Sequence, residues 1–223
     1  MDRLDFKSYI AAHKARLTAR HCKNRLRWAK EHLNWTEDQW RSVIWSDESR
    51  FCVECSKRGK RVLRKEEERY DERNIIPTVK WGGGGAMVWG CFWGGGFGSL
   101  EIIDTSSVDQ ETYINILANK FHPWFTNVTL HQERDFTFQE DGASCHTGGY
   151  ARCPDLNPIE HVWDALERRI ERKRSSIKNL EQLKVALREE WERMDDEFAD
   201  RLVRSMKRRC EAVIKTKGGA TEY

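Results

Sequence analysis

The chain has 223 residues, with 39 Lys or Arg against 36 Asp or Glu and a formal net charge of +3 at neutral pH. This length allows one sizeable α/β core, and the nearly balanced charge means that attraction to nucleic acid has to come from local patches. The longest apolar run, residues 86–93, is interrupted by Gly90. We therefore expect an intracellular protein with neither a signal peptide nor a membrane span.

Hydrophobic periodicity predicts strands followed by a helical C-terminal third. In chain order, the pattern predicts a helix over 17–33, strands over 43–51, 86–93 and 99–104, a helix over 108–125, a strand over 136–140, and helices over 159–170, over 177–194 and from about 196 to Gly218. The segment 53–79 is long, charged and weakly patterned, as in a solvated hairpin with a loop.

The glycine-rich and cysteine motifs exclude two kinds of site. WGGGGAM lacks the lysine of a Walker motif and leads into a strand, so it is not a phosphate-binding loop. Seven scattered cysteines, an odd number, argue against a disulfide framework and favour a reducing compartment. Cys52 and Cys55 form a lone CxxC without a second pair of ligands, which argues against structural zinc.

Three acidic residues in unlike surroundings suggest a metal site. Asp47 in WSDESRF and Asp141 in QEDGASCHT follow short strand-like runs, whereas Glu160 in PDLNPIEHVW opens a helix. Hard divalent cations such as Mg²⁺ accept a few carboxylates and keep several waters. Two strand-borne acids and one helix-borne acid therefore suit a metal site that processes phosphate.

Each of these acids also has a simpler interpretation. Asp47 could be an acid at the end of a strand, and Asp141 before Gly142 could start an Asp-Gly turn. With Asn157 as N-cap, Glu160 falls at the third helical position, where a glutamate closes a capping box and meets the positive end of the helix dipole. Capping and metal binding are compatible. We assign no catalytic role to His146 or His161.

The motifs WSDESRF, VKWGGGGAMVWGCF, QEDGASCHT, PDLNPIEHVW and AVIKTKGGATEY resemble the Tc/mariner DDE transposases, in particular the Tc-one-like branch, from about Arg16 to Tyr223. The resemblance implies an RNase H-like α/β fold with a mixed five-stranded-type sheet flanked by helices. It also implies that Asp47, Asp141 and Glu160 bind two Mg²⁺ or Mn²⁺ ions, which cut DNA and join the freed 3′-hydroxyl to a target.

Two departures from the family pattern limit this expectation. We expect the chain to lack the helix-turn-helix region that precedes the catalytic domain in the family. Only 18 residues separate Asp141 from Glu160, whereas the family usually has a spacer roughly twice as long. We therefore expect a fold that lacks one strand and one helix, with the fourth strand left as an uncovered edge and with impaired catalysis. Gly142 also replaces an asparagine that is common in relatives.

The domain plan and partners follow from this resemblance. Residues 1–40 are expected to form a basic linker helix region and residues 41–223 the catalytic domain. Basic residues between Lys14 and Lys30 and between Arg204 and Lys217 predict weak, non-specific DNA binding, although both could equally be solvated helix faces. The family uses the equivalent of residues 53–79 in a dimer contact, so a homodimer is possible. Action on chromosomal DNA implies the nucleus.

Two other functions fit the same sequence. One is a non-catalytic remnant of a transposon that binds nucleic acid or dimerises through its basic helices. The other is a metal-dependent nuclease without sequence preference. Titration with a divalent metal separates the catalytic interpretations from the first of these.

Overall fold

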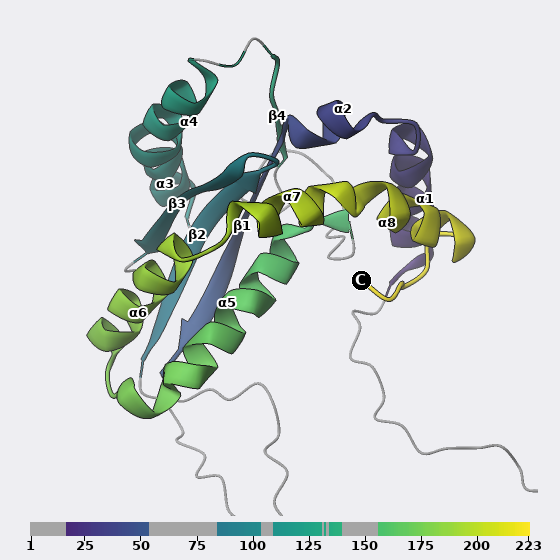
Figure 1. The fold of residues 1–223 in the computed structure, drawn as a ribbon. Coiled ribbons are helices and arrows are strands. Elements are labelled where there is room, and N and C mark those ends of the chain that lie inside the picture. The colour runs from purple at the N-terminus through teal and green to yellow at the C-terminus, as the bar shows by residue number, and fades with distance from the viewer. Residues whose placement is uncertain (1–16, 54–83, 104–108, 131, 133, 140–155) are drawn as a thin grey trace, which may run out of the picture.

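A mixed sheet lies at the centre of the fold (Figure 1). The computed structural model describes residues 17–53, 84–103, 109–130, 132, 134–139 and 156–223. Within them, the sheet has four strands in the order β3-β2-β1-β4. Their bounds are β1 (Val43–Cys52), β2 (Gly85–Trp93), β3 (Gly96–Ile103) and β4 (Thr137–Gln139). β1 and β2, and β2 and β3, pair antiparallel, whereas β1 and β4 pair parallel.

Helices cover both faces of the sheet because successive side chains of each strand point to opposite faces. In β1, Val43 and Trp45 belong to the larger core and Ile44 belongs to the smaller one. Three helices pack against the first face: α5 (Ile159–Lys173), α6 (Leu180–Glu192) and α7 (Asp196–Arg204). The second face is covered by α3 (Gln110–Ile116), the π-helical turn η3 (Leu117–Phe121) and α4 (His122–Thr129). The predicted α/β layering is therefore confirmed.

The N-terminal helices lie beside the C-terminal end of the chain (Figure 1). α1 (Ala19–His32) packs on α8 (Met206–Lys215), and the short α2 (Glu37–Arg41) contacts α7. Arg25 of α1, with 1% of its surface exposed, donates from Nε to the Gly218 carbonyl and from Nη2 to the Gly219 carbonyl, both at 3.0 Å. The predicted domain boundary at residue 40 stays a prediction.

Several predicted elements differ from the structure in detail. The helix expected over 108–125 begins at Gln110 and continues through the π turn to Thr129. The helix predicted from about residue 196 to Gly218 is divided at Ser205 into α7 and α8. Farther back in the chain, a short 3₁₀ turn, η5 (Arg174–Ser176), lies between α5 and α6. Among the described cysteines, Cys22, Cys91 and Cys210 are free and Cys52 is disulfide-bonded, and the expected reducing compartment stays a prediction. Among the described helices, none has the length and apolar character that a bilayer span needs.

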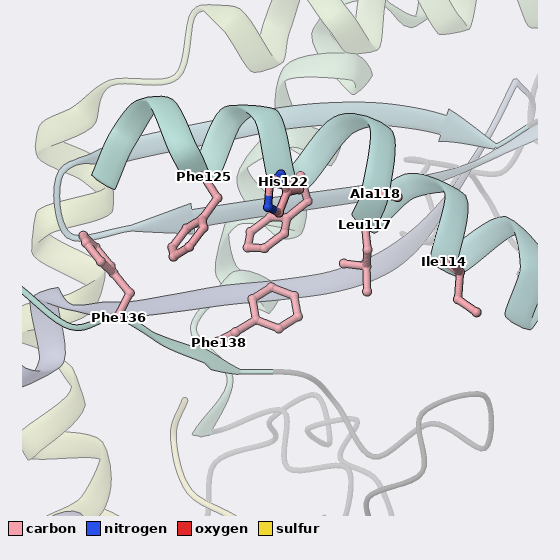
Figure 2. A pocket seen from close by; sticks show the side chains of 8 residues that line it. Ile114, Leu117, Ala118, His122, Phe125, Phe136 and Phe138 are labelled. Carbon is pink, nitrogen blue, oxygen red and sulfur yellow. The ribbon is translucent and has the colours of Figure 1, made fainter. Parts of the chain in front are cut away.

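β4 is an edge strand of the described sheet, and an apolar groove lies between it and the helices α3 to α4. Figure 2 shows aromatic and aliphatic side chains from both sides facing this groove, which has a volume of about 460 Å³. The lining residues are Ile114, Leu117, Ala118, Phe121, His122, Phe125, Phe136 and Phe138. That the fourth strand is left as an uncovered edge stays a prediction, because the residues that follow β4 lie outside the described part of the chain. Most of the shortened spacer, residues 140–155, and most of 53–79 lie outside the described residues.

Candidate active site

Asp47 lies near the middle of β1, on the face that α5 covers. Its cross-strand partner is Gly90 of β2, and the side chain is partly exposed. The indole Nε1 of Trp163, on α5, donates a hydrogen bond to Asp47 Oδ2 at 3.1 Å. This bond joins residues 116 positions apart in sequence, and it fixes a carboxylate of the central strand against the helix.

Glu160 lies in the first turn of α5, and its position corrects one sequence-based prediction. The helix begins at Ile159 with Pro158 as N-cap, so Glu160 is the second helical residue. No N-cap side-chain hydrogen bond forms, because Pro158 occupies the cap that Asn157 was expected to provide. Asn157 Oδ1 instead accepts a long bond of 3.5 Å from the Ile159 amide. Glu160 remains exposed at the positive end of the helix dipole.

Asp47 faces α5, and Glu160 lies in the first turn of the same helix. Glu160 and Trp163 are three residues apart on one helix, a spacing that places side chains on neighbouring positions of one face, about 5–6 Å apart at Cβ. Since Trp163 bonds Asp47 directly, Asp47 lies against the N-terminal half of the helix whose first turn carries Glu160. That Asp47 and Glu160 share one metal site stays a prediction.

Asp141 lies outside the described residues, so its place in the site stays a prediction. In the described part of the chain, no group of three His, Cys, Asp or Glu side chains forms a metal cluster. β4 ends at Gln139, which pairs with Trp45 of β1. Gln139 precedes Asp141 by two residues, and Trp45 precedes Asp47 by two residues.

Two further side chains shape this region and were missed by sequence reasoning. The ring of Trp163 stacks on Trp191 of α6 at a centroid distance of 5.4 Å. Both rings lie over Gly90, where an added Cβ would come within 2.8 Å of Trp163 and 3.0 Å of Trp191. Both tryptophans fall in segments where hydrophobic periodicity predicts helices, 159–170 and 177–194. That periodicity contains no signal that one indole nitrogen reaches a carboxylate.

Exposed basic side chains form a stripe along α1. They recur at intervals of three and four residues, so they share one face of the helix. The residues are Arg20, Lys23, Arg27 and Lys30. The second predicted patch, 204–217, is partly engaged within the protein. Arg204 pairs with Glu37 and Asp200, and the buried Arg209 donates to Ser205 Oγ at 2.8 Å and lies over the Tyr223 ring.

Comparison with known proteins identifies the family. The transposase of transposable element Tcb1 from Caenorhabditis briggsae is 37% identical over 217 residues, covering 90% of this chain and 77% of that protein. The Tc1 transposase of Caenorhabditis elegans is 39% identical over 216 residues, with 89% and 77% covered. The chain belongs to the Tc1/mariner transposase family. No protein-family model matches the chain.

Solved structures of a Tc1/mariner protein share the fold. A pre-cleavage Mos1 transpososome matches with a TM-score of 0.82 at 16% identity, covering 98% of this chain and 68% of the Mos1 chain. The catalytic domain of Mos1 mariner transposase matches with a TM-score of 0.69 at 15% identity, covering 95% of this chain and the whole of that domain. These matches confirm the predicted RNase H-like fold.

Proposed function

We propose that the chain is the catalytic domain of a transposon-derived protein of DNA transposition, which cuts and joins DNA at a site built from Asp47, Asp141 and Glu160. The observation that carries the proposal is the Trp163–Asp47 hydrogen bond, which holds a central-strand carboxylate beside the first turn of α5, where Glu160 lies. Two sequence relatives, which share more than a third of their aligned residues with it, are named as transposases.

The donor set fits Mg²⁺ or Mn²⁺. Both described candidate ligands offer carboxylate oxygens, the donors that these hard cations prefer. Both side chains are accessible to solvent, as an ion that must also contact a DNA phosphate requires. When bound, a pair of such ions stabilises the attacking and leaving oxygens of a phosphodiester. Support also comes from Mos1, whose solved structures include a paired-end complex with Mn and one with Mg.

The proposed partner is DNA, bound weakly and without sequence preference in the nucleus. The basic stripe of α1, formed by Arg20, Lys23, Arg27 and Lys30, offers regularly spaced charges for phosphate contacts. Charges of this kind position a duplex but do not read its sequence. A homodimer is part of the same proposal.

Catalysis is proposed to be impaired relative to the chain's relatives, because the spacer between Asp141 and Glu160 is short and an apolar groove lies beside β4 in the described part of the chain. Aligning two metal-bound carboxylates requires a scaffold precise to a fraction of an ångström. The second candidate function, a non-catalytic remnant that binds nucleic acid, is favoured by one observation: the basic stripe on α1 does not depend on the carboxylates.

A plasmid-nicking assay with Mg²⁺ and Mn²⁺ tests the proposal. We expect slow nicking that is abolished in Asp47→Asn and in Glu160→Gln and kept in Glu192→Gln, a control at the exposed end of α6. Nicking that persists in the first two variants would show that these carboxylates are not the site. DNA binding without any metal-dependent nicking would instead favour the non-catalytic remnant.

A further inference from the structure

We infer that Trp163 is a positioning residue for the metal site: its indole N–H orients the carboxylate of Asp47 and sets the distance between β1 and the first turn of α5. The inference rests on the proposed function, because it takes Asp47 and Glu160 as ligands. It assigns to an apolar core residue a role in the geometry of the site, through the 3.1 Å bond from Nε1 to Asp47 Oδ2.

The indole is held rigidly enough for this role. Trp163 is 5% exposed, stacks on Trp191 at an interplanar angle of 29°, and meets the edge of Phe51 at 6.3 Å. Trp191 is fixed in turn by its own N–H, which donates to the Gly98 carbonyl at 2.8 Å. A closely packed aromatic ring can change its orientation only if its neighbours move, so the donor at its edge has a defined direction.

Gly90 makes the approach possible. It is the cross-strand partner of Asp47, and the rings of Trp163 and Trp191 occupy the space that a side chain would take there. A Cβ at this position would lie closer to Trp163 than packed atoms allow, at 2.8 Å. The absence of a side chain opposite Asp47 thus leaves room for the indole, whose N–H reaches the carboxylate.

This bond does more than satisfy a buried donor. It engages one carboxylate oxygen of Asp47, and so restricts rotation of a group that must present its oxygens to an ion. Because Glu160 is three residues away on the same helix, the bond also fixes the relative position of the two proposed ligands. Hydrogen-bonding partners that orient a ligand typically affect metal affinity by about 10- to 100-fold.

The test compares two tryptophan-to-phenylalanine variants of the full chain. Trp163→Phe and Trp191→Phe each lose one indole hydrogen bond from the same stack, but only the first loses a bond to Asp47. Mn²⁺ affinity is measured by calorimetry, with thermal unfolding as the check on folding. We expect Trp163→Phe to weaken Mn²⁺ binding by about 10- to 100-fold, and Trp191→Phe, which keeps a ring in the stack and the bond to Asp47, to weaken it much less at a similar loss of stability.

The other outcomes distinguish a failure of the proposed function from a failure of the role of Trp163. If Asp47→Asn keeps the Mn²⁺ affinity of the unchanged chain, or if the unchanged chain binds no Mn²⁺, the proposed function is wrong. If Asp47→Asn abolishes binding but the two phenylalanine variants behave alike, only the role of Trp163 is wrong. A readout without metal is the indole ¹⁵N–H resonance of Trp163, which should move in Asp47→Asn; an unmoved resonance would contradict the bond itself.

Discussion

Arg25 joins α1 to the end of the chain, and its replacement by methionine should strongly destabilise the protein. The side chain is 1% exposed, and its guanidinium donates to the carbonyls of Gly218 and Gly219. Arg25→Met keeps most of the aliphatic stem but removes both donors. Each hydrogen bond from a charged group contributes about 1.5–3 kcal/mol, so the two together contribute about 3–6 kcal/mol.

This loss is a large part of the roughly 5–15 kcal/mol that stabilises a typical domain. At about 2–4 °C per kcal/mol for a chain of this size, the melting temperature should fall by at least about 6 °C. Thermal unfolding followed by circular dichroism measures the shift. Limited proteolysis should show earlier cleavage at the exposed Arg20 and Lys23, because α1 loses its hydrogen bonds to the C-terminal residues that follow α8.

Arg27→Met is the matched control on the same helix. Its side chain is 66% exposed and meets Glu31 at 4.0 Å, so its replacement should change stability by no more than about 0.5 kcal/mol. Gly218→Ala tests the other end of the contact: Gly218 has a φ of +86°, and an added Cβ would lie 2.0 Å from the Cys22 carbonyl oxygen. If Arg25→Met is no more harmful than Arg27→Met, the C-terminal residues do not hold α1 in place.

Three other predictions concern different regions. Lys23→Glu should weaken binding to a random-sequence duplex and lower the steepness of log K against log salt by about 0.9 or more. Arg188→Glu on α6 should change neither the affinity nor the slope. Fluorescence anisotropy at several salt concentrations measures the two quantities. The hydrogen bond from Lys173 holds the pKa of Glu190 below its ordinary value of 4.5. The ionised Glu190 therefore stabilises the folded protein fully above pH 4.5, and this stabilisation is lost as the pH falls through the lower pKa of the folded state. Glu190→Gln should therefore lower the urea midpoint at neutral pH but make it less sensitive to acid, and an unchanged acid profile would contradict this. Leu166→Ala, which empties a fully buried position on α5, should cost about 2–5 kcal/mol in urea unfolding.

The fold was predictable from the sequence because its core elements have clear periodicity. β1 runs from Val43 to Cys52, one residue longer than predicted, and α5 buries the predicted stripe that includes Ile159, Val162 and Leu166. In β1 the apolar positions decide which side chains pack against the helices on each face of the sheet. In α5 they decide which face of the helix meets the sheet. A pattern of this kind requires no knowledge of distant contacts.

Local hydrogen bonding was harder to predict. The apolar spacing continues across Ser205, yet the helix divides there, and the Ser205 hydroxyl donates to the Leu202 carbonyl at 2.6 Å and accepts from Arg209 at 2.8 Å. Such bonds compete with the regular helical pattern without changing hydrophobic periodicity. At the start of α5, Pro158 has φ and ψ of −68° and −13°, close to helical values, and so takes the cap position that Asn157 was expected to fill.

In the candidate site, sequence motifs indicated the acids but not what holds them. Asp47 and Glu160 were recognisable from their motifs and their places at a strand and a helix start. The bond between Trp163 and Asp47 depends on the packing of α5 across the sheet, and on a glycine at position 90. A contact across 116 residues leaves no local pattern, so only the folded chain could reveal it.

The two described sides of the site differ in how firmly they are held, which leads to a last prediction. Asp47 is fixed by β2 and by Trp163, whereas β4, which leads toward Asp141, pairs with β1 through three residues and borders the apolar groove. Lengthening the spacer between His146 and Ala151 to the family's usual length should cover this groove, raising the melting temperature and Mn²⁺ affinity together. The Trp163 indole resonance should stay unchanged, because the β1–α5 contact is already complete. If the longer spacer leaves nicking rate and Mn²⁺ affinity as they are in the unmodified chain, the short connection does not impair catalysis.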